Sequence, residues 1–132
     1  LIVSHHPLLF RGLKTISDLT DVQRTVLKAI KNDIAVVSMH TNMDNASGGV
    51  NFRIAQKLAL RNVRFFAQKS VDGIEAGSGV VGELPTAMAA DDFIIVVKKA
   101  FGVECAMCNE LLRRPVSRYI CSSASPWGTR RR

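Results

Sequence analysis

The sequence predicts an α/β fold in which a mostly parallel sheet is flanked by helices. Hydrophobic residues make up 47% and charged residues 22% of the 132 residues, which is the composition of an ordinary globular domain. Over residues 1–67, short apolar runs rich in β-branched residues alternate with segments of helical period. Alternating strands and helices of this kind are typical of α/β folds built on a parallel sheet.

The first elements are expected to be a strand, a helix and a second strand. Leu1–Val3 is predicted to be the last part of a buried strand, and the helix is expected to begin at Thr20, which has capping-box spacing to Gln23. Asn32 and Asp33 close this helix. Residues 34–38 form a continuous apolar run, which is typical of a strand covered on both faces.

Four further elements are expected in the middle of the chain. A loop at 39–49 leads to a helix at 50–60, and the VRFF stretch predicts a strand at 62–67. Residues 68–79 contain three glycines and are predicted to form a loop. A short strand at 80–84 then ends at Pro85.

The last elements are expected to be a helix at 89–101 and a strand at 103–107. The helix has Asp91 and Asp92 in its first turn, lysines in its last turn and Gly102 directly after it.

The positive charge is concentrated at the C-terminal end. Residues 1–112 carry twelve Lys and Arg against eleven Asp and Glu, whereas residues 113–132 carry six Arg and no acid. A nucleic-acid-binding domain more often spreads basic residues over a folded face, so this class of partner is disfavoured. We expect a domain at 1–116 and a divergent, poorly ordered basic tail at 117–132.

Three cysteines, an odd number, suit a reducing compartment, and we expect a cytoplasmic protein. No stretch approaches the roughly 20 apolar residues of a membrane span. The chain begins with Leu1 inside a predicted strand, so we expect its natural start to be missing.

His5 and His6 form the clearest functional motif, directly after the first predicted strand. Side chains of adjacent residues diverge, so paired histidines suit a centre in which two ions lie roughly 3.5–4 Å apart and each imidazole binds one. Pro7 stiffens this loop. The alternative is that one histidine ends the strand and the other is solvated.

His40 and Asp44 form an H-x-x-x-D pair after the second predicted strand. A carboxylate can bridge two cations, so Asp44 is a candidate ligand, and His40 is either a ligand or a group that orients one. Under the alternative, Asp44 or Asn45 caps the helix that begins near Val50, and His40 only packs. Loops at the carboxyl ends of parallel strands open onto one edge of the sheet, so we expect the two histidine loops to converge.

These ligand types predict a metal but not a complete site. Imidazole and carboxylate suit zinc, iron, manganese or nickel, and ligand type does not rank these ions. Two four-coordinate ions need about eight ligand positions, less those that bridging groups supply. The residues present therefore predict part of a two-metal centre.

Cys105 and Cys108 have the spacing of half a zinc-ribbon site, but a second pair is lacking and Cys121 follows only thirteen residues later. We interpret the pair as part of a buried strand.

Three groups of segments resemble the NIF-three-like family, whose members are known as GTP cyclohydrolase 1 type 2 homologues or dinuclear-metal-centre proteins. These segments are IVSHHPLLFRGLK, then HTNMDNASGGVN with IAQKLAL, and GSGVVGELP with DDF and VKKAFG. They occur in the family's order, and the resemblance covers about residues 1–116.

The resemblance implies an α/β fold and a ring-shaped homohexamer with two divalent metal ions per complete chain. It implies that His5, His6 and Asp44 are metal ligands and that His40 lies beside the site. The family completes its centre with a histidine and a glutamate near the end of a longer chain, so we expect this chain to be truncated at both ends. After Arg118 the sequence departs from the family's glycine-rich pattern.

Three functional hypotheses follow. The full-length protein is a dinuclear metal-dependent hydrolase with a small-molecule or nucleotide substrate, by the logic of two-metal sites. Alternatively, it is a non-enzymatic metal-binding or regulatory assembly protein, or the chain is a non-functional fragment. No catalytic residue beyond the metal ligands is indicated.

Overall fold

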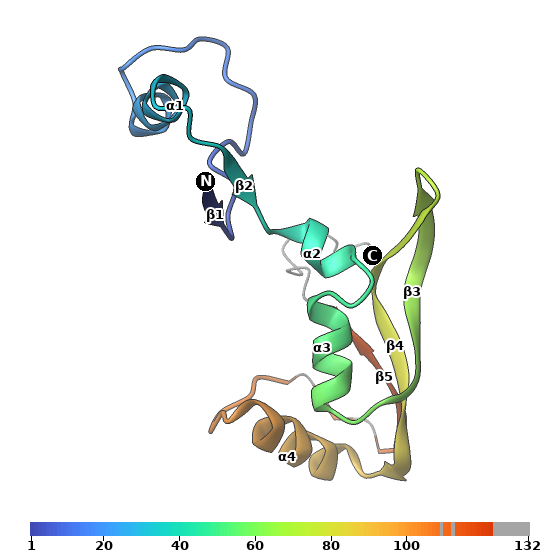
Figure 1. The fold of residues 1–132 in the computed structure, drawn as a ribbon. Coiled ribbons are helices and arrows are strands. Elements are labelled where there is room, and N and C mark those ends of the chain that lie inside the picture. The colour runs from blue at the N-terminus through green and yellow to red at the C-terminus, as the bar shows by residue number, and fades with distance from the viewer. Residues whose placement is uncertain (109, 112, 123–132) are drawn as a thin grey trace. The chain divides into compact units, whose positions relative to one another are not determined.

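The computed structural model describes residues 1–108, 110–111 and 113–122. The chain divides into two compact units, residues 1–42 and residues 43–132. Figure 1 traces the order of the elements along the chain.

The first unit contains a two-stranded parallel sheet and one long helix. β1 (Ile2–Ser4) pairs in parallel with β2 (Val36–Ser38), and Val3 lies opposite Val37. Between them lies α1 (Asp21–Lys31). This strand–helix–strand order confirms the prediction for residues 1–38.

α1 begins at the predicted cap. The hydroxyl of Thr20 accepts a hydrogen bond from the main-chain N–H of Gln23 at 3.3 Å. The Gln23 side chain in turn accepts a hydrogen bond from the hydroxyl of Ser17 at 2.8 Å. The bond to Thr20 satisfies an N-terminal amide that the helix cannot pair within itself.

The two parallel strands are exposed, whereas the sequence predicted buried ones. Val3 is 63% exposed and Val37 is 43% exposed. Within the described residues of the first unit, no side chain belongs to the buried class. The apolar runs predicted the strands correctly. The strands are nevertheless exposed, because a sheet of only two strands buries little of its own surface.

The second unit contains a three-stranded antiparallel sheet, so the prediction of a mostly parallel sheet is wrong. β3 (Arg61–Val71) and β4 (Ile74–Met88) form a long hairpin, and β5 (Val116–Cys121) pairs with the other edge of β4. The fold is therefore mixed α/β, with a small parallel sheet and a larger antiparallel one.

The expected loop at 68–79 instead forms most of the hairpin arm and its turn. Asp72 and Gly73 have positive φ angles of 52° and 77°, as a two-residue turn between antiparallel strands requires. Gly77 lies where a Cβ would stand 2.8 Å from the main-chain oxygen of Phe66, so this glycine allows close strand pairing. The glycines that suggested a loop serve the hairpin.

The strand expected at 103–107 is absent, because residues 103–108 belong to no strand. β5 lies mostly inside the expected tail. Along this strand Tyr119 and Cys121 are more buried than their neighbours Arg118 and Ile120. This alternation is typical of a strand with one covered face. Residues 123–132, the rest of the expected tail, lie outside the described residues.

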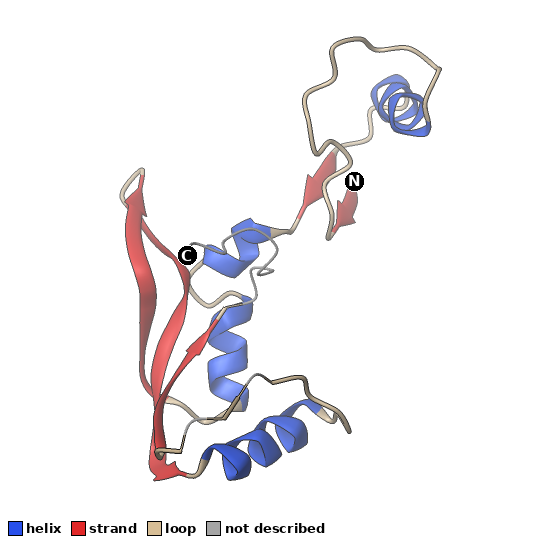
Figure 2. Ribbon diagram, turned by 180° about the vertical axis from the view of Figure 1, so that it is seen from behind, coloured by secondary structure: helices blue, strands red, loops and turns tan. Residues whose placement is uncertain are grey.

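Besides the sheet, the second unit contains the helices α3 (Val50–Lys57) and α4 (Ala90–Phe101), and the short helix α2 (Thr41–Asn45) lies at its N-terminal boundary. α2 is a helix where a loop was predicted, and the boundary between the units falls within it. α3 and α4 confirm the two predicted helices. Figure 2 shows α3 and α4 on the same side of the antiparallel sheet.

The core of the second unit lies between these helices and the sheet. Its buried apolar residues come from α3, the sheet, α4 and the turn after α3, and they are Ala55, Leu58, Leu60, Val80, Leu84, Phe93 and Cys121. Among the described residues, no helix has both the length and the apolar character that crossing a membrane requires.

Candidate metal centre

The loop after β1 carries His5 and His6 and is tied to the neighbouring strand. The hydroxyl of Ser4 donates a hydrogen bond to the main-chain oxygen of His6 at 2.9 Å. The same hydroxyl lies 3.2 Å from the hydroxyl of Ser38 on β2. These contacts hold the doubled-histidine loop at the carboxyl end of the parallel pair.

The segment after β2 carries His40 and is held by Asn42. The main-chain N–H of His40 donates to the side-chain oxygen of Asn42 at 2.7 Å. The side-chain nitrogen of Asn42 donates to the main-chain oxygen of Ser38 at 3.1 Å. Asn42 thus closes a tight local turn in which the asparagine side chain replaces main-chain partners.

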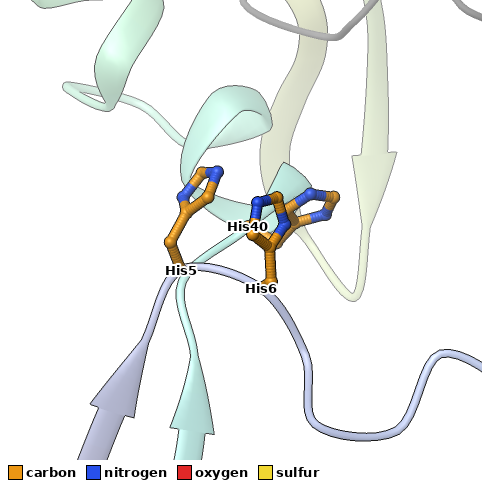
Figure 3. Close-up of side chains that lie close together, drawn as sticks. All are labelled: His5, His6 and His40. Carbon is orange, nitrogen blue, oxygen red and sulfur yellow. The ribbon is translucent and has the colours of Figure 1, made fainter.

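The predicted convergence of the two histidine loops is confirmed within the first unit. The ring centroids of His5 and His6 lie 4.6 Å apart, and those of His40 lie 5.2 Å from His5 and 5.4 Å from His6. One candidate ligand nitrogen from each ring lies within 4.8 Å of the others. Figure 3 shows the three rings together beyond the ends of the two strands.

The arrangement fits a metal ion in its donor chemistry. Imidazole nitrogens bind zinc at about 2.0–2.1 Å, which places two ligand nitrogens of a tetrahedral ion roughly 3.3 Å apart. His5 and His6 are exposed and His40 is half-buried. Side-chain rotation of the exposed pair can therefore bring the nitrogens from the observed spacing to the bonded one.

Phe10 is a neighbour of the cluster that the sequence did not indicate. Its ring centroid lies 6.1 Å from that of His40, in an edge-to-face arrangement. This contact limits the orientations of the His40 ring. Ser4, Ser38 and Asn42 were also missed as supporting residues, although all three lie within the two motifs.

Asp44 lies in α2 and belongs to the second unit. Its main-chain oxygen accepts a hydrogen bond from the side chain of Asn51 at 2.8 Å. The N-cap residue of α3 is Gly49, which is neither of the two residues, Asp44 and Asn45, that the alternative proposed as caps. The assignment of Asp44 as a metal ligand stays a prediction.

Cys105 and Cys108 are exposed, so their interpretation as part of a buried strand is wrong. Among the described residues, the three histidines form the only group of three or more candidate ligands close enough to share an ion. Within the part of the chain that the structure describes, the cysteine pair therefore belongs to no comparable metal cluster.

Comparison with known proteins connects these motifs to a family. The family model of Duf34/NIF3 (NGG1p interacting factor 3) matches residues 1–124. A GTP cyclohydrolase 1 type 2 homolog from Clostridium perfringens is 39% identical over 104 residues, which cover 79% of this chain and 39% of that protein. A protein of the same description from Bacillus subtilis is 43% identical over 57% of this chain and 20% of its own length.

Solved structures share the fold. A hypothetical protein from Staphylococcus aureus aligns over 96% of this chain and 53% of its own with a TM-score of 0.69 and 24% identity. A Bacillus cereus protein related to NIF3 aligns over 89% of this chain and 58% of its own with a TM-score of 0.63 and 21% identity.

The chain spans no more than about two fifths of the length of the two curated relatives described above. The family model, in contrast, matches nearly all of the chain, including both histidine motifs. This chain belongs to the Duf34/NIF3 family, as its doubled histidine and H-T-N-M-D motifs predicted.

Proposed function

We propose that this chain contributes His5, His6, His40 and Asp44 to a divalent-metal centre, and that the full-length protein is a dinuclear metal-dependent hydrolase. The observation that carries the proposal is the convergence of three imidazole rings from two separate loops. Two histidine loops that meet at one sheet edge are typical of a ligand site.

The residues of this chain have distinct tasks in the proposed centre. His5 and His6 present imidazole nitrogens from one loop, and Ser4 positions that loop through the His6 carbonyl. Asn42 positions His40. Divalent ions held there would supply Lewis acidity and an activated water, as in other two-metal sites.

We expect the chain alone to bind at most one ion, and weakly. Structural zinc sites in peptides have a binding free energy of about 10–16 kcal/mol, and the loss of one or two ligands removes several kcal/mol of it. Zinc, iron, manganese and nickel all suit these ligands. Isothermal titration calorimetry that reveals two tight sites would contradict this expectation.

The substrate and the assembly are further parts of the proposal. Relatives described as GTP cyclohydrolase 1 type 2 homologues support a nucleotide or another small molecule as substrate. The homohexamer is implied by the family resemblance. The family description as NGG1p interacting factor 3 supports a second candidate, a non-enzymatic metal-binding or regulatory protein with a protein partner.

Metal content measured after dialysis against zinc, manganese or nickel tests the ligand set. We expect His5→Ala and His6→Ala each to lower bound metal at least several-fold. His40→Ala should match them if His40 binds directly and have a smaller effect if it only orients a ligand. Asp44→Ala tests the carboxylate, and Asp18→Ala, at an exposed aspartate away from both motifs, is the control.

Unchanged metal content in the His5 and His6 variants would overturn the ligand assignment. Equal losses in the Asp18 control would show non-specific binding by exposed acids. A full-length relative assayed against GTP and phosphoesters then separates a hydrolase from a binding protein.

A further inference from the structure

Cys105 and Cys108 form an exposed thiol pair that the proposed metal centre does not use. Met107, between them, is fully exposed at 104% of its reference area. α4 ends firmly before this segment, because Gly102 is left-handed with φ 64° and the N–H of Val103 bonds the oxygen of Lys98 at 3.0 Å. The two cysteines therefore lie in a connecting segment outside the helix.

The backbone between the two thiols can close into a turn. Residues 105–108 lie in no helix, strand, turn or bend, and within the described residues they make no main-chain hydrogen bond. A disulfide needs Cα atoms about 4.4–6.8 Å apart. A β-turn brings its first and fourth Cα atoms within about 7 Å, and the common type I turn accepts most residues at its centre. A turn over this C-A-M-C stretch would therefore place both sulfurs in bonding range.

The third cysteine provides a contrast inside the same chain. Cys121 is only 2% exposed, and burial raises the pKa of its thiol to about 11. Since the thiolate is the reacting form, Cys121 is protected both by its low accessibility and by its protonation near neutral pH. Disulfide exchange is thereby directed to the exposed pair.

We propose that Cys105 and Cys108 form a reversible intramolecular disulfide by exchange with a low-molecular-weight disulfide such as oxidised glutathione. One cysteine thiolate attacks a sulfur of glutathione disulfide, which forms a mixed disulfide and releases one glutathione. The second thiolate attacks the protein sulfur of the mixed disulfide and releases the other glutathione. The two cysteines lose two electrons and two protons, and two glutathione thiols are formed.

This bond would reshape the wall of a neighbouring pocket. Met107 and Cys108 line a cavity of about 410 Å³ together with Phe93 of α4 and Tyr119 of β5. Closing a turn at 105–108 moves this wall relative to the helix and the strand. The proposal concerns the second unit only and does not rest on the metal centre.

Thiol counting by mass spectrometry tests the proposal. The chain is equilibrated with EDTA in glutathione buffers of rising oxidised fraction, quenched with acid, unfolded and alkylated with N-ethylmaleimide. With three cysteines in the sequence, we expect three adducts under reducing conditions and one adduct, at Cys121, under oxidising conditions. Dithiothreitol should restore three adducts.

Two variants serve as controls for the same measurement. Cys121→Ala should change from two adducts to none, because the exposed pair is intact. Cys105→Ser should accumulate a glutathione adduct at Cys108, because no second thiol resolves the mixed disulfide. Three adducts in every buffer, glutathione adducts that persist on the wild-type chain, or disulfide-linked dimers on a non-reducing gel would each overturn the proposal.

Discussion

The side chain of Asn51 links the end of α2 to α3. It is fully buried, at 0% exposure, and donates a hydrogen bond to the main-chain oxygen of Asp44 at 2.8 Å. A buried carboxamide is favourable only when it is hydrogen-bonded, because its desolvation must be offset. This one residue therefore anchors the end of α2, which carries Asp44, to α3.

We predict that Asn51→Ala lowers the free energy of unfolding by about 1–3 kcal/mol, because it removes a buried hydrogen bond and leaves a small void. Urea denaturation followed by circular dichroism measures the change. Gln56→Ala, at an exposed position of the same helix, is the matched control. Similar losses in both variants would show that Asn51 has no special role.

At the scale of elements, the long hairpin depends on small residues along β4. Phe65 packs edge-to-face against Phe52 of α3, with ring centroids 5.1 Å apart. A Cβ at Gly77 would lie 2.7 Å from the Phe65 ring and 2.8 Å from the main-chain oxygen of Phe66. A side chain at this position would therefore push β3 away from β4.

We predict that Gly77→Ala destabilises the second unit by about 1–3 kcal/mol, as overpacking usually does. The expected readout is a lower urea midpoint with loss of strand signal. Gly12→Ala is the control, since a Cβ there would meet no atom within 4 Å. An unchanged urea midpoint for Gly77→Ala would contradict this prediction, because β3 and β4 would then accommodate the added Cβ without loss of stability.

At the scale of the whole molecule, the hydrophobic core of the described residues lies in the second unit alone. All seven buried apolar residues lie between Ala55 and Cys121, whereas the first unit exposes Leu1, Val3 and Ile30 by more than 60%. Regions with few buried apolar contacts open with a small free energy. The histidine cluster is thus carried by the unit with the weaker packing.

We predict faster amide exchange in residues 1–42 than in the β3–β4 hairpin. Hydrogen exchange with mass spectrometry should detect this difference without metal. Added zinc should slow exchange near His5 and His40, because an ion that binds only the folded form stabilises it.

Equal exchange in both units would contradict the predicted difference in stability. Zinc protection that persists in a His5→Ala, His6→Ala double variant would show that the metal binds elsewhere. These two outcomes separate the stability of the unit from the assignment of its ligands.

Local signals in the sequence were sufficient to predict α1, α3 and α4 and the convergence of the two histidine motifs. The Thr20 cap and the Gly102 stop are short-range features, so α1 and α4 could be predicted near their observed ends. The histidine motifs follow strands, and the parallel pairing of β1 and β2 places them on one edge. Pairing within the second unit was not predicted, because the glycines of β4 resemble loop residues until a partner strand lies against them.

By itself, the sequence determined the family and the helices α1, α3 and α4, and it named His5, His6 and Asp44 as candidate ligands with His40 beside them, because these depend on motifs and on neighbours within a few residues. Only the tertiary structure decided that the larger sheet is antiparallel, that β5 extends it and that Cys105 and Cys108 are exposed. These properties depend on which distant segments pair and cover one another, and hydrophobic periodicity along the chain does not specify that choice.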